Sequence, residues 1–200
     1  MNIIIFGPPG AGKGTQSKNL VKKFNSFQIS TGDMLRDEIN NDTEIGKKII
    51  SNINNGDFVD DSIVNKLLEK IIFDTKKLNK LVFDGYPRTI NQAKNLEILL
   101  DKSNQKIDYI FFLNVKKDSI IKRIEKRKTL EKRSDDEANV ILKRYDTYME
   151  ITKPVLDYYS KNENFHEVDG SMKINDISQK IEEIISEWDI DIESTSYIKG

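Results

Sequence analysis

The sequence predicts an α/β fold in which helices cover both faces of a parallel sheet. Short apolar runs, bounded by polar residues or glycine, have the length and composition of strands buried on both faces. Four of them recur along the 200 residues, at 3–6, 81–83, 110–113 and 165–168. Apolar residues at three- and four-residue steps, from Ile63 to Ile72 and from Ile177 to Ile185, indicate helices among them. Strands that alternate with helices are joined by right-handed crossovers, which makes the sheet parallel.

The amino-acid composition argues against several classes of protein. A formal net charge of −1 does not suit a globally basic nucleic-acid binder or a polybasic membrane protein, so we expect neither partner. The chain has no cysteine, which excludes disulfides and thiolate zinc sites and fits a cytoplasmic location. The first apolar run is too short for a signal-peptide core, and no segment is long enough to span a bilayer. We therefore expect one domain over 1–200.

The first predicted strand leads directly into a glycine-rich loop, Gly7-Pro8-Pro9-Gly10-Ala11-Gly12-Lys13-Gly14-Thr15. The order of strand, loop and helix is the one that a phosphate-binding P-loop requires. In such a loop, glycines let successive backbone N–H groups point at phosphate oxygens, and the next helix adds its positive N-terminal end. Lys13 is spaced to reach the β- and γ-phosphates of a nucleotide. An ordinary glycine turn would explain the glycines but not this lysine.

One position departs from the common P-loop. Gly14 stands where a serine or threonine normally follows the lysine and coordinates magnesium. We therefore expect Mg²⁺ to be held mainly by phosphates and water, with a carboxylate nearby, and Thr15 to contact phosphate. Asp84 ends the apolar run 81–83, and it resembles the acidic residue that holds magnesium beside other P-loops, here through water. The alternative is a loop-capping role for Asp84.

Two helix starts carry capping boxes. Thr89 with Gln92, and Ser134 with Glu137, have the spacing at which the two side chains satisfy each other's backbone N–H groups. Residues after Trp188 show no clear apolar period, so no element is predicted there.

Five segments, the P-loop among them, together resemble the adenylate kinases: GPPGAGKGTQ (7–16), STGDMLR (30–36), GDFV (56–59), DGYPRT (84–89) with Gln92, and RKTLEKRSDD (127–136) with Arg144. They occur in the family's order over nearly the whole chain, which is more specific than any one segment. The resemblance implies a P-loop three-layer α/β/α fold with five parallel strands, a helical monophosphate-binding insertion over 30–59 and a short lid over 126–132. It also implies a monomer that binds ATP, AMP and ADP and transfers a phosphoryl group from ATP to AMP with Mg²⁺.

The resemblance assigns an AMP site as well. Its implied contacts are Thr31, Arg36, Asp57, Phe58, Val59, Gly85, Tyr86, Pro87, Arg88 and Gln92, with Arg133 and Arg144 near the phosphates. The planar, permanently charged forks of Arg36 and Arg88 suit a phosphate, and Arg88 follows a strand's C-terminal end, where open α/β sheets bind ligands. Taken alone, Arg36 better fits a solvated surface residue. Gln92 has an equal alternative role in satisfying the backbone of its own helix. A cis Tyr86–Pro87 bond is also implied.

The ATP site and the lid follow from the same resemblance. The implied ATP contacts are Gly10, Ala11, Gly12, Lys13, Gly14, Thr15, Arg123, Arg127 and the backbone of Met172, and the implied catalytic residues are Lys13, Arg88, Arg127, Arg133 and Arg144. Only 128–132 separate Arg127 from Arg133, so the longer, zinc-binding lid is absent and no zinc is expected. Arg123 and Arg127 are four residues apart on a helical segment and share a face. A solvated basic helix is the alternative.

The acceptor of this reaction is itself a phosphate, so no strong general base is required. Positioning and charge neutralisation should carry the transfer, and His166 is expected to be structural. A UMP/CMP kinase is one alternative, but such enzymes typically carry alanine in place of Thr31 and asparagine in place of Thr89. A nucleotide-binding regulator without transfer activity is another, although it could have lost the arginines that this chain has at every expected position.

Overall fold

The computed structural model describes residues 1–74, 80–131 and 138–196, and their side chains except those of 74, 126–131, 138–139 and 188–196. In these ranges one parallel sheet has the strand order β2-β3-β1-β4-β5. The strands are β1 (Asn2–Phe6), β2 (Phe27–Ser30), β3 (Leu81–Asp84), β4 (Tyr109–Asn114) and β5 (Phe165–Asp169). The predicted α/β class is therefore confirmed, as are the four strands predicted from apolar runs.

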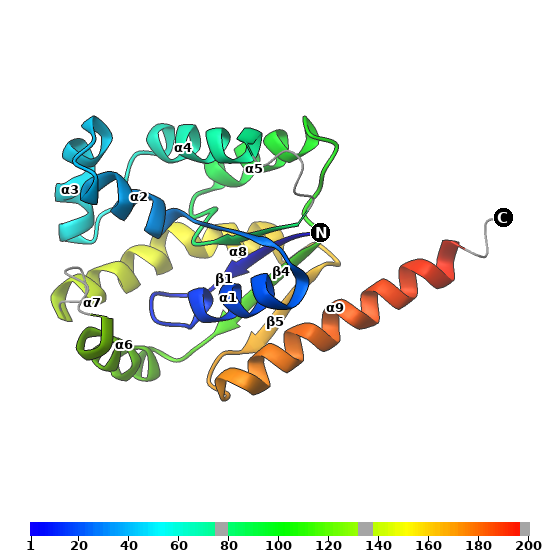
Figure 1. Ribbon diagram of the computed structural model, residues 1–200. Helices are drawn as coiled ribbons and strands as arrows, with labels where there is room; N and C mark the ends of the chain where they lie inside the picture. Colours follow the sequence, from blue (N-terminus) through cyan, green and yellow to red (C-terminus); the bar gives the residue numbers. More distant parts are fainter. Residues whose placement is uncertain (75–79, 132–137, 197–200) are drawn as a thin grey trace.

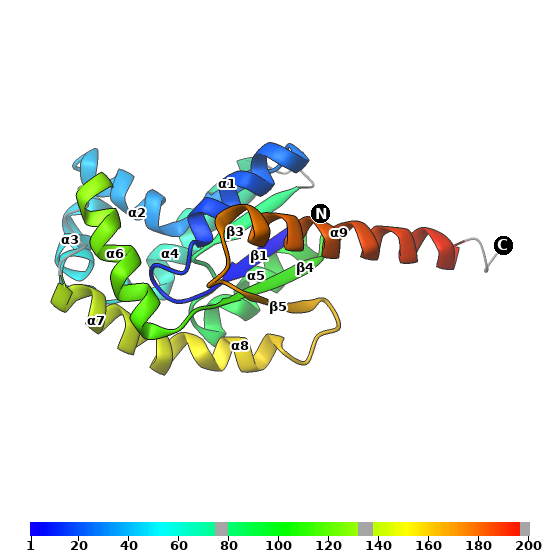
Figure 2. The same ribbon diagram turned by 90° about the horizontal axis from the view of Figure 1, so that it is seen from below.

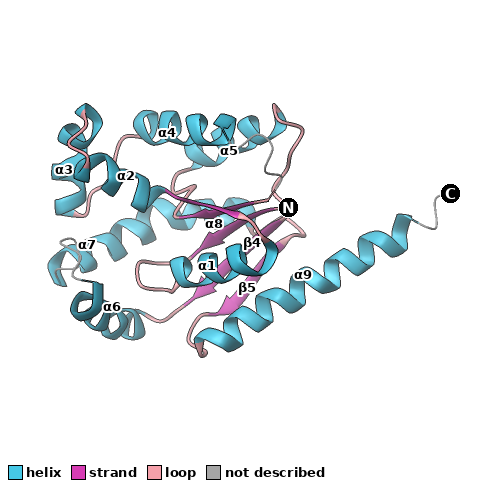
Figure 3. Cartoon of the chain, viewed as in Figure 1, coloured by secondary structure: helices cyan, strands magenta, loops and turns pink. Residues whose placement is uncertain are grey.

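Helices cover both faces of this sheet (Figures 1 and 2). They are α1 (Lys13–Phe24), α2 (Thr31–Asn40), α3 (Glu44–Asn55), α4 (Asp61–Asp74), α5 (Ile90–Asp101), α6 (Lys117–Glu131), α7 (Ala138–Thr147), α8 (Lys153–Tyr159) and α9 (Ile174–Ser196). Helices α1 and α9 lie on one face, and α4, α5 and α8 lie on the other, which gives the three layers seen in Figure 3.

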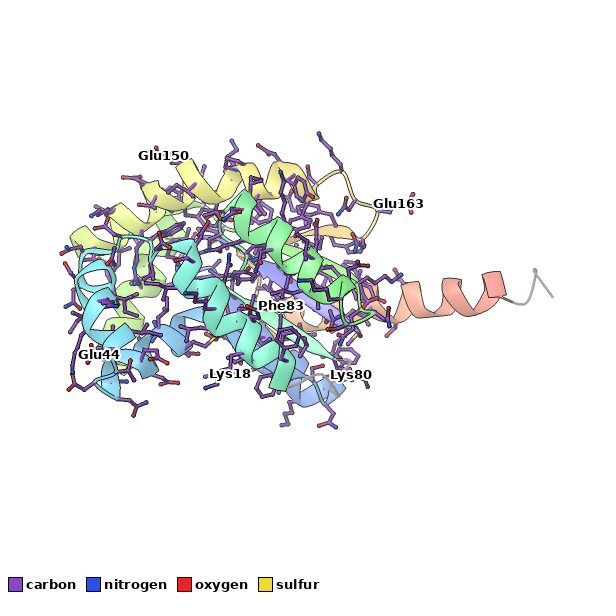
Figure 4. The ribbon with its side chains drawn as sticks, turned by 90° about the horizontal axis from the view of Figure 1, so that it is seen from above. Lys18, Glu44, Lys80, Phe83, Glu150 and Glu163 are labelled. Atoms are coloured by element: carbon purple, nitrogen blue, oxygen red, sulfur yellow. The ribbon has the colours of Figure 1, made fainter. Side chains whose placement is uncertain are left out.

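Strand β1 shows why the sheet forms the middle layer. Ile3 and Ile5 pack into the apolar cluster that α1 and α9 share, whereas Ile4 and Phe6 pack into the cluster of the opposite face. Burial of each such side chain contributes about 1.5–3 kcal/mol. Figure 4 shows Phe83 of the neighbouring strand in the interior, where it is fully buried. The central strand therefore holds the loop that follows it at the C-terminal edge of the sheet.

Helices α2 and α3 form a pair that lies beside α6 and α7 in both views of the ribbon (Figures 1 and 2). The pair is tightly packed, because a Cβ at Gly46 of α3 would lie 2.1 Å from the backbone oxygen of Glu38 in α2. The Thr43 hydroxyl accepts a hydrogen bond from the Gly46 N–H at 2.9 Å and so caps α3.

The C-terminal part of the chain adds helix that the sequence pattern left unassigned. A π-helical segment, Tyr148–Thr152, joins α7 to α8, and α9 continues past Trp188 to Ser196, beyond the sheet (Figure 1). A helix that is already anchored by Ile177, Ile181 and Ile185 extends at little cost, because each added residue gains one hydrogen bond. No helix in the described ranges is long and apolar enough to cross a membrane.

Candidate active site

The P-loop connects β1 to α1 at the C-terminal edge of the sheet. Gly10 and Gly12 have φ angles of 81° and 99°, in the left-handed region that favours glycine. Helix α1 begins at Lys13, and its start has no side-chain cap, so its first N–H groups can serve a ligand. The Lys13 ammonium donates to the backbone oxygens of Gly7 at 2.7 Å and Pro8 at 3.1 Å. The loop thus combines backbone donors and a cation, as a phosphate site requires.

Asp84, at the end of β3, lies beside this loop because β3 pairs with β1, with Asp84 opposite Ile5. A Cβ at Gly14 would be 3.3 Å from Asp84 Oδ2, so the usual serine or threonine would crowd the carboxylate. The same oxygen accepts a hydrogen bond from Gln28 Nε2 at 3.2 Å. An oxygen donor this close to a phosphate-binding loop fits a hard cation such as Mg²⁺. Gln28 was not predicted from the sequence, because it belongs to no recognised motif and lies on the edge strand β2.

The loop after β3 brings together two of the predicted AMP contacts. Gly85 has a φ of 75°, and the Tyr86–Pro87 bond is cis, as expected. The Thr31 hydroxyl and the Arg88 Nε both donate to the Gly85 backbone oxygen, at 2.8 and 2.7 Å. A Cβ on Gly85 would lie 3.0 Å from Arg88 Nη2 and 3.2 Å from Thr31 Oγ1. Glycine is therefore required here both by the backbone and by the close approach of these two side chains.

Arg88 lies close enough to three other charged side chains for them to shift its pKa. Burial, and secondarily the positive charge of Arg144, lowers the pKa of its guanidinium to about 10, although Asp84 opposes the shift and Arg36 adds to it. The group remains charged at neutral pH, and its Cζ lies 5.4 Å from the centre of the Phe58 ring. Arg144 and Arg36 both disfavour the positive charge of Arg88, and an anionic phosphate would relieve this repulsion. In the structure Arg36 is also paired with Asp33, with Nη2 and Oδ1 2.5 Å apart.

Gln92 is held by hydrogen bonds at both ends of its side chain and is only 3% exposed. Its Oε1 accepts from the Arg88 N–H at 2.8 Å, and its Nε2 donates to Asp61 Oδ1 at 2.6 Å. Thr89 caps α5 by accepting from the Gln92 N–H at 3.1 Å. Only half of the predicted capping box forms, because the Gln92 oxygen accepts from the N–H of Arg88 instead of from the N–H of the cap residue Thr89. The box of Ser134 and Glu137 lies outside the described residues.

Helix α7 contacts the end of α3, next to the predicted AMP contacts 57–59. A Cβ at Gly56 would lie 3.0 Å from Val140 Cγ1 and 3.2 Å from Arg144 Cγ. The Lys143 ammonium and the Asp57 carboxylate form an ion pair at 2.6 Å. These contacts bring Arg144 to the residues that follow α3.

Arg123 of α6 links the P-loop to the segment that follows β5. Its guanidinium donates to the backbone oxygen of Gly170 at 2.7 Å and to that of Ala11 at 3.3 Å. Met172 lies two residues after Gly170 and is partly buried against the apolar cluster that α1 and α9 share. Arg133 and the side chain of Arg127 lie outside the described residues. His166 lies against Phe111, with ring centres 5.6 Å apart, and burial lowers its pKa.

Comparison with known proteins points to one family. A family model described as adenylate kinase matches residues 5–164. A relative of that name from Pelagibacter ubique is 48% identical, in an alignment that includes 92% of this chain and 99% of the relative. Relatives of the same name from Mycoplasma mycoides and Bartonella henselae are each 41% identical, over 89% and 92% of this chain and 93% and 100% of their own.

Proposed function

The chain belongs to the adenylate kinase family, and from this premise we propose how its residues transfer a phosphoryl group reversibly from ATP to AMP. The observation that carries the proposal is the position of Arg88. This partly buried cation donates a hydrogen bond to the backbone oxygen of Gly85. Asp84, which precedes Gly85 at the end of β3, lies opposite Ile5 of β1, and β1 leads into the P-loop. An anion bound at Arg88 would therefore lie near phosphates bound in that loop.

On the ATP side, the backbone N–H groups of 10–15 bind the phosphates. Lys13 exchanges its contacts with Gly7 and Pro8 for the β- and γ-phosphates. We assign Arg123 and the backbone of Met172 to the base, and Arg127 to the phosphates. The bridge that Arg123 makes between Ala11 and Gly170 supports its assignment to this side.

On the AMP side, Arg36 and Arg88 bind the monophosphate, and Thr31, 57–59, 85–87 and Gln92 surround the nucleoside. The shared hydrogen-bond acceptor of Thr31 and Arg88, the Gly85 oxygen, supports this grouping. Phe58, whose ring lies against the Arg88 guanidinium, supports the inclusion of the segment that follows α3.

Transfer itself needs alignment and charge neutralisation rather than a base. Arg88 and Arg144, with Arg127 and Arg133, surround the transferring group and stabilise its equatorial oxygens. When bound, Mg²⁺ supplies further positive charge at the phosphates, and Asp84 would hold it through water. The close approach of Asp84 to Gly14 and its hydrogen bond from Gln28 support that role.

Two parts of the chain act as covers. We assign the AMP cover to the insertion 30–59 and the ATP cover to a short lid over 126–132. Their closure excludes water, so that ATP does not lose its phosphoryl group to hydrolysis before AMP binds.

The test is the formation of ADP from ATP with AMP, CMP or UMP in turn, each with and without Mg²⁺. We expect AMP with Mg²⁺ to give the highest kcat/KM. Preference for a pyrimidine nucleotide would overturn the choice of acceptor. ATP binding without ADP formation would support a regulator in place of an enzyme.

A further inference from the structure

Asp61, the first residue of α4, connects that helix to the first turn of α5. Its Oδ1 accepts from Gln92 Nε2 at 2.6 Å, and its Oδ2 accepts from the Thr89 hydroxyl at 2.7 Å. Asn91 Nδ2 lies 3.4 Å from the same Oδ2. Neither the motifs nor the roles assigned above include this carboxylate, although it contacts a residue assigned to the AMP base.

The partners of Gln92 determine which way its amide points. A backbone N–H can only donate a hydrogen bond, and a carboxylate can only accept one. The amide must therefore turn its oxygen to the Arg88 N–H and its nitrogen to Asp61, as it does at 2.8 and 2.6 Å. A flipped amide would place donor against donor at one end and acceptor against acceptor at the other. Asp61 thus holds one of the two contacts that fix this orientation.

A fixed amide has consequences for the base that it can recognise. After these two bonds, Gln92 retains one N–H and one oxygen lone pair, in a defined order. A 6-amino purine presents a donor at its amino group and an acceptor at N1, whereas a 6-oxo purine presents an acceptor at O6 and a donor at N1. A freely rotating amide could suit either edge, but an amide held in one orientation suits only one of them.

We propose that Asp61 is a positioning residue that fixes the orientation of the Gln92 amide and thereby selects a 6-amino over a 6-oxo purine monophosphate. This inference rests on the proposed function, in which Gln92 contacts the base of AMP. Asp61 itself touches no substrate. Its effect on the reaction passes through Gln92 and, by way of Thr89, through the cap of α5.

A merely structural role for Asp61 makes a different prediction. If the carboxylate only joined the starts of α4 and α5, its loss would lower thermal stability and would affect all acceptors alike. Selection by amide orientation instead changes the ratio of kcat/KM for AMP to that for IMP, which has the 6-oxo base.

The test compares Asp61→Asn with Asp60→Asn. Both remove one negative charge at adjacent positions, but the Asp60 carboxylate accepts from the Ser62 N–H at 2.8 Å, in an exposed contact. With saturating ATP, we expect Asp61→Asn to raise the KM for AMP about tenfold and to change kcat by less than about threefold. Asparagine replaces a charge-assisted hydrogen bond with a neutral one, and its amide can turn an N–H toward Gln92, so position 61 no longer dictates the orientation of that amide. The ratio of kcat/KM for AMP to that for IMP should fall about tenfold. Asp60→Asn should keep the wild-type ratio.

The outcomes separate this inference from the proposed function. A wild-type protein that makes no ADP from AMP overturns the proposed function. A wild-type protein that is active on AMP but uses IMP equally well, or an Asp61→Asn variant with an unchanged AMP-to-IMP ratio, overturns the role of Asp61 alone. If Asp61→Asn fails to fold, Asp61→Ser gives the same test, because serine suits the start of a helix but is too short to hold the amide. An unchanged ratio in that variant has the same meaning.

Discussion

The two proposed nucleotide sites differ in what holds their side chains. On the ATP side, cations donate to backbone carbonyls, as Lys13 does to Gly7 and Arg123 does to Gly170. On the AMP side, side chains also hold one another, and Gln92 links Asp61 to the backbone of Arg88. Under the proposed assignments, binding of ATP should therefore exchange backbone contacts for phosphate contacts, whereas AMP should meet groups that are already oriented. Preorganisation of this kind lowers the entropy lost on binding and favours discrimination between ligands.

This contrast predicts how substitutions on each side should act. Changes to Lys13, the cation proposed to contact the transferred phosphoryl group, should reduce kcat, because they remove charge stabilisation in the transition state. Changes to the AMP-side network should chiefly alter KM for the acceptor or its selection. Replacement of Lys13, alanine at a glycine of each side, and replacement of Lys143 test the contrast, in decreasing order of expected effect.

Replacement of Lys13 should have the largest effect. Lys13→Met removes the ammonium that we propose binds the β- and γ-phosphates, so kcat should fall about a thousandfold or more. AMP affinity, measured by calorimetry in the absence of ATP, should change by less than about threefold, because Lys13 belongs to the ATP side. Lys18→Met, at an exposed position on the same helix, is the matched control and should leave kcat unchanged. Turnover near the wild-type value in Lys13→Met would contradict the assignment of the P-loop lysine.

Glycine substitutions on the two sides form a second, smaller test. Gly85→Ala combines a left-handed φ of 75° with a Cβ only 3.0 Å from Arg88 Nη2, so the KM for AMP should rise about tenfold. The ATP-side counterpart is Gly12→Ala, where φ is 99° and no atom lies within 4 Å of the added Cβ. It introduces backbone strain without crowding and should raise the KM for ATP instead. Equal changes of both KM values in either variant would show that the two sites are not separable.

The same contrast explains what the sequence could predict. The P-loop and the 85–88 loop are continuous segments, and three of the four predicted strands, 3–6, 81–83 and 110–113, are continuous apolar runs. Strand β2 was not found by its pattern, because it lies at the sheet edge and only Ile29 in it is buried. The bond between Asp61 and Gln92 joins residues 31 positions apart, and no local pattern marks such a pair. Thus the ATP loop could be predicted from sequence, whereas the network behind the AMP site required the fold.

The smallest expected effect comes from the ion pair that joins the AMP side to α7. Lys143 and Asp57 are 2.6 Å apart, but their side chains are 48% and 44% exposed, so the pair should contribute about 1 kcal/mol or less. Lys143→Met should therefore raise the KM for AMP by about fivefold at most, and added salt should remove the difference. The charge exchange Lys143→Asp with Asp57→Lys should recover part of the loss. Lys23→Met removes a similar pair with Glu182, between α1 and α9, and should not alter the KM for AMP. A salt-independent loss in Lys143→Met would mean that the lysine acts through packing of α7 against Gly56 instead of through charge.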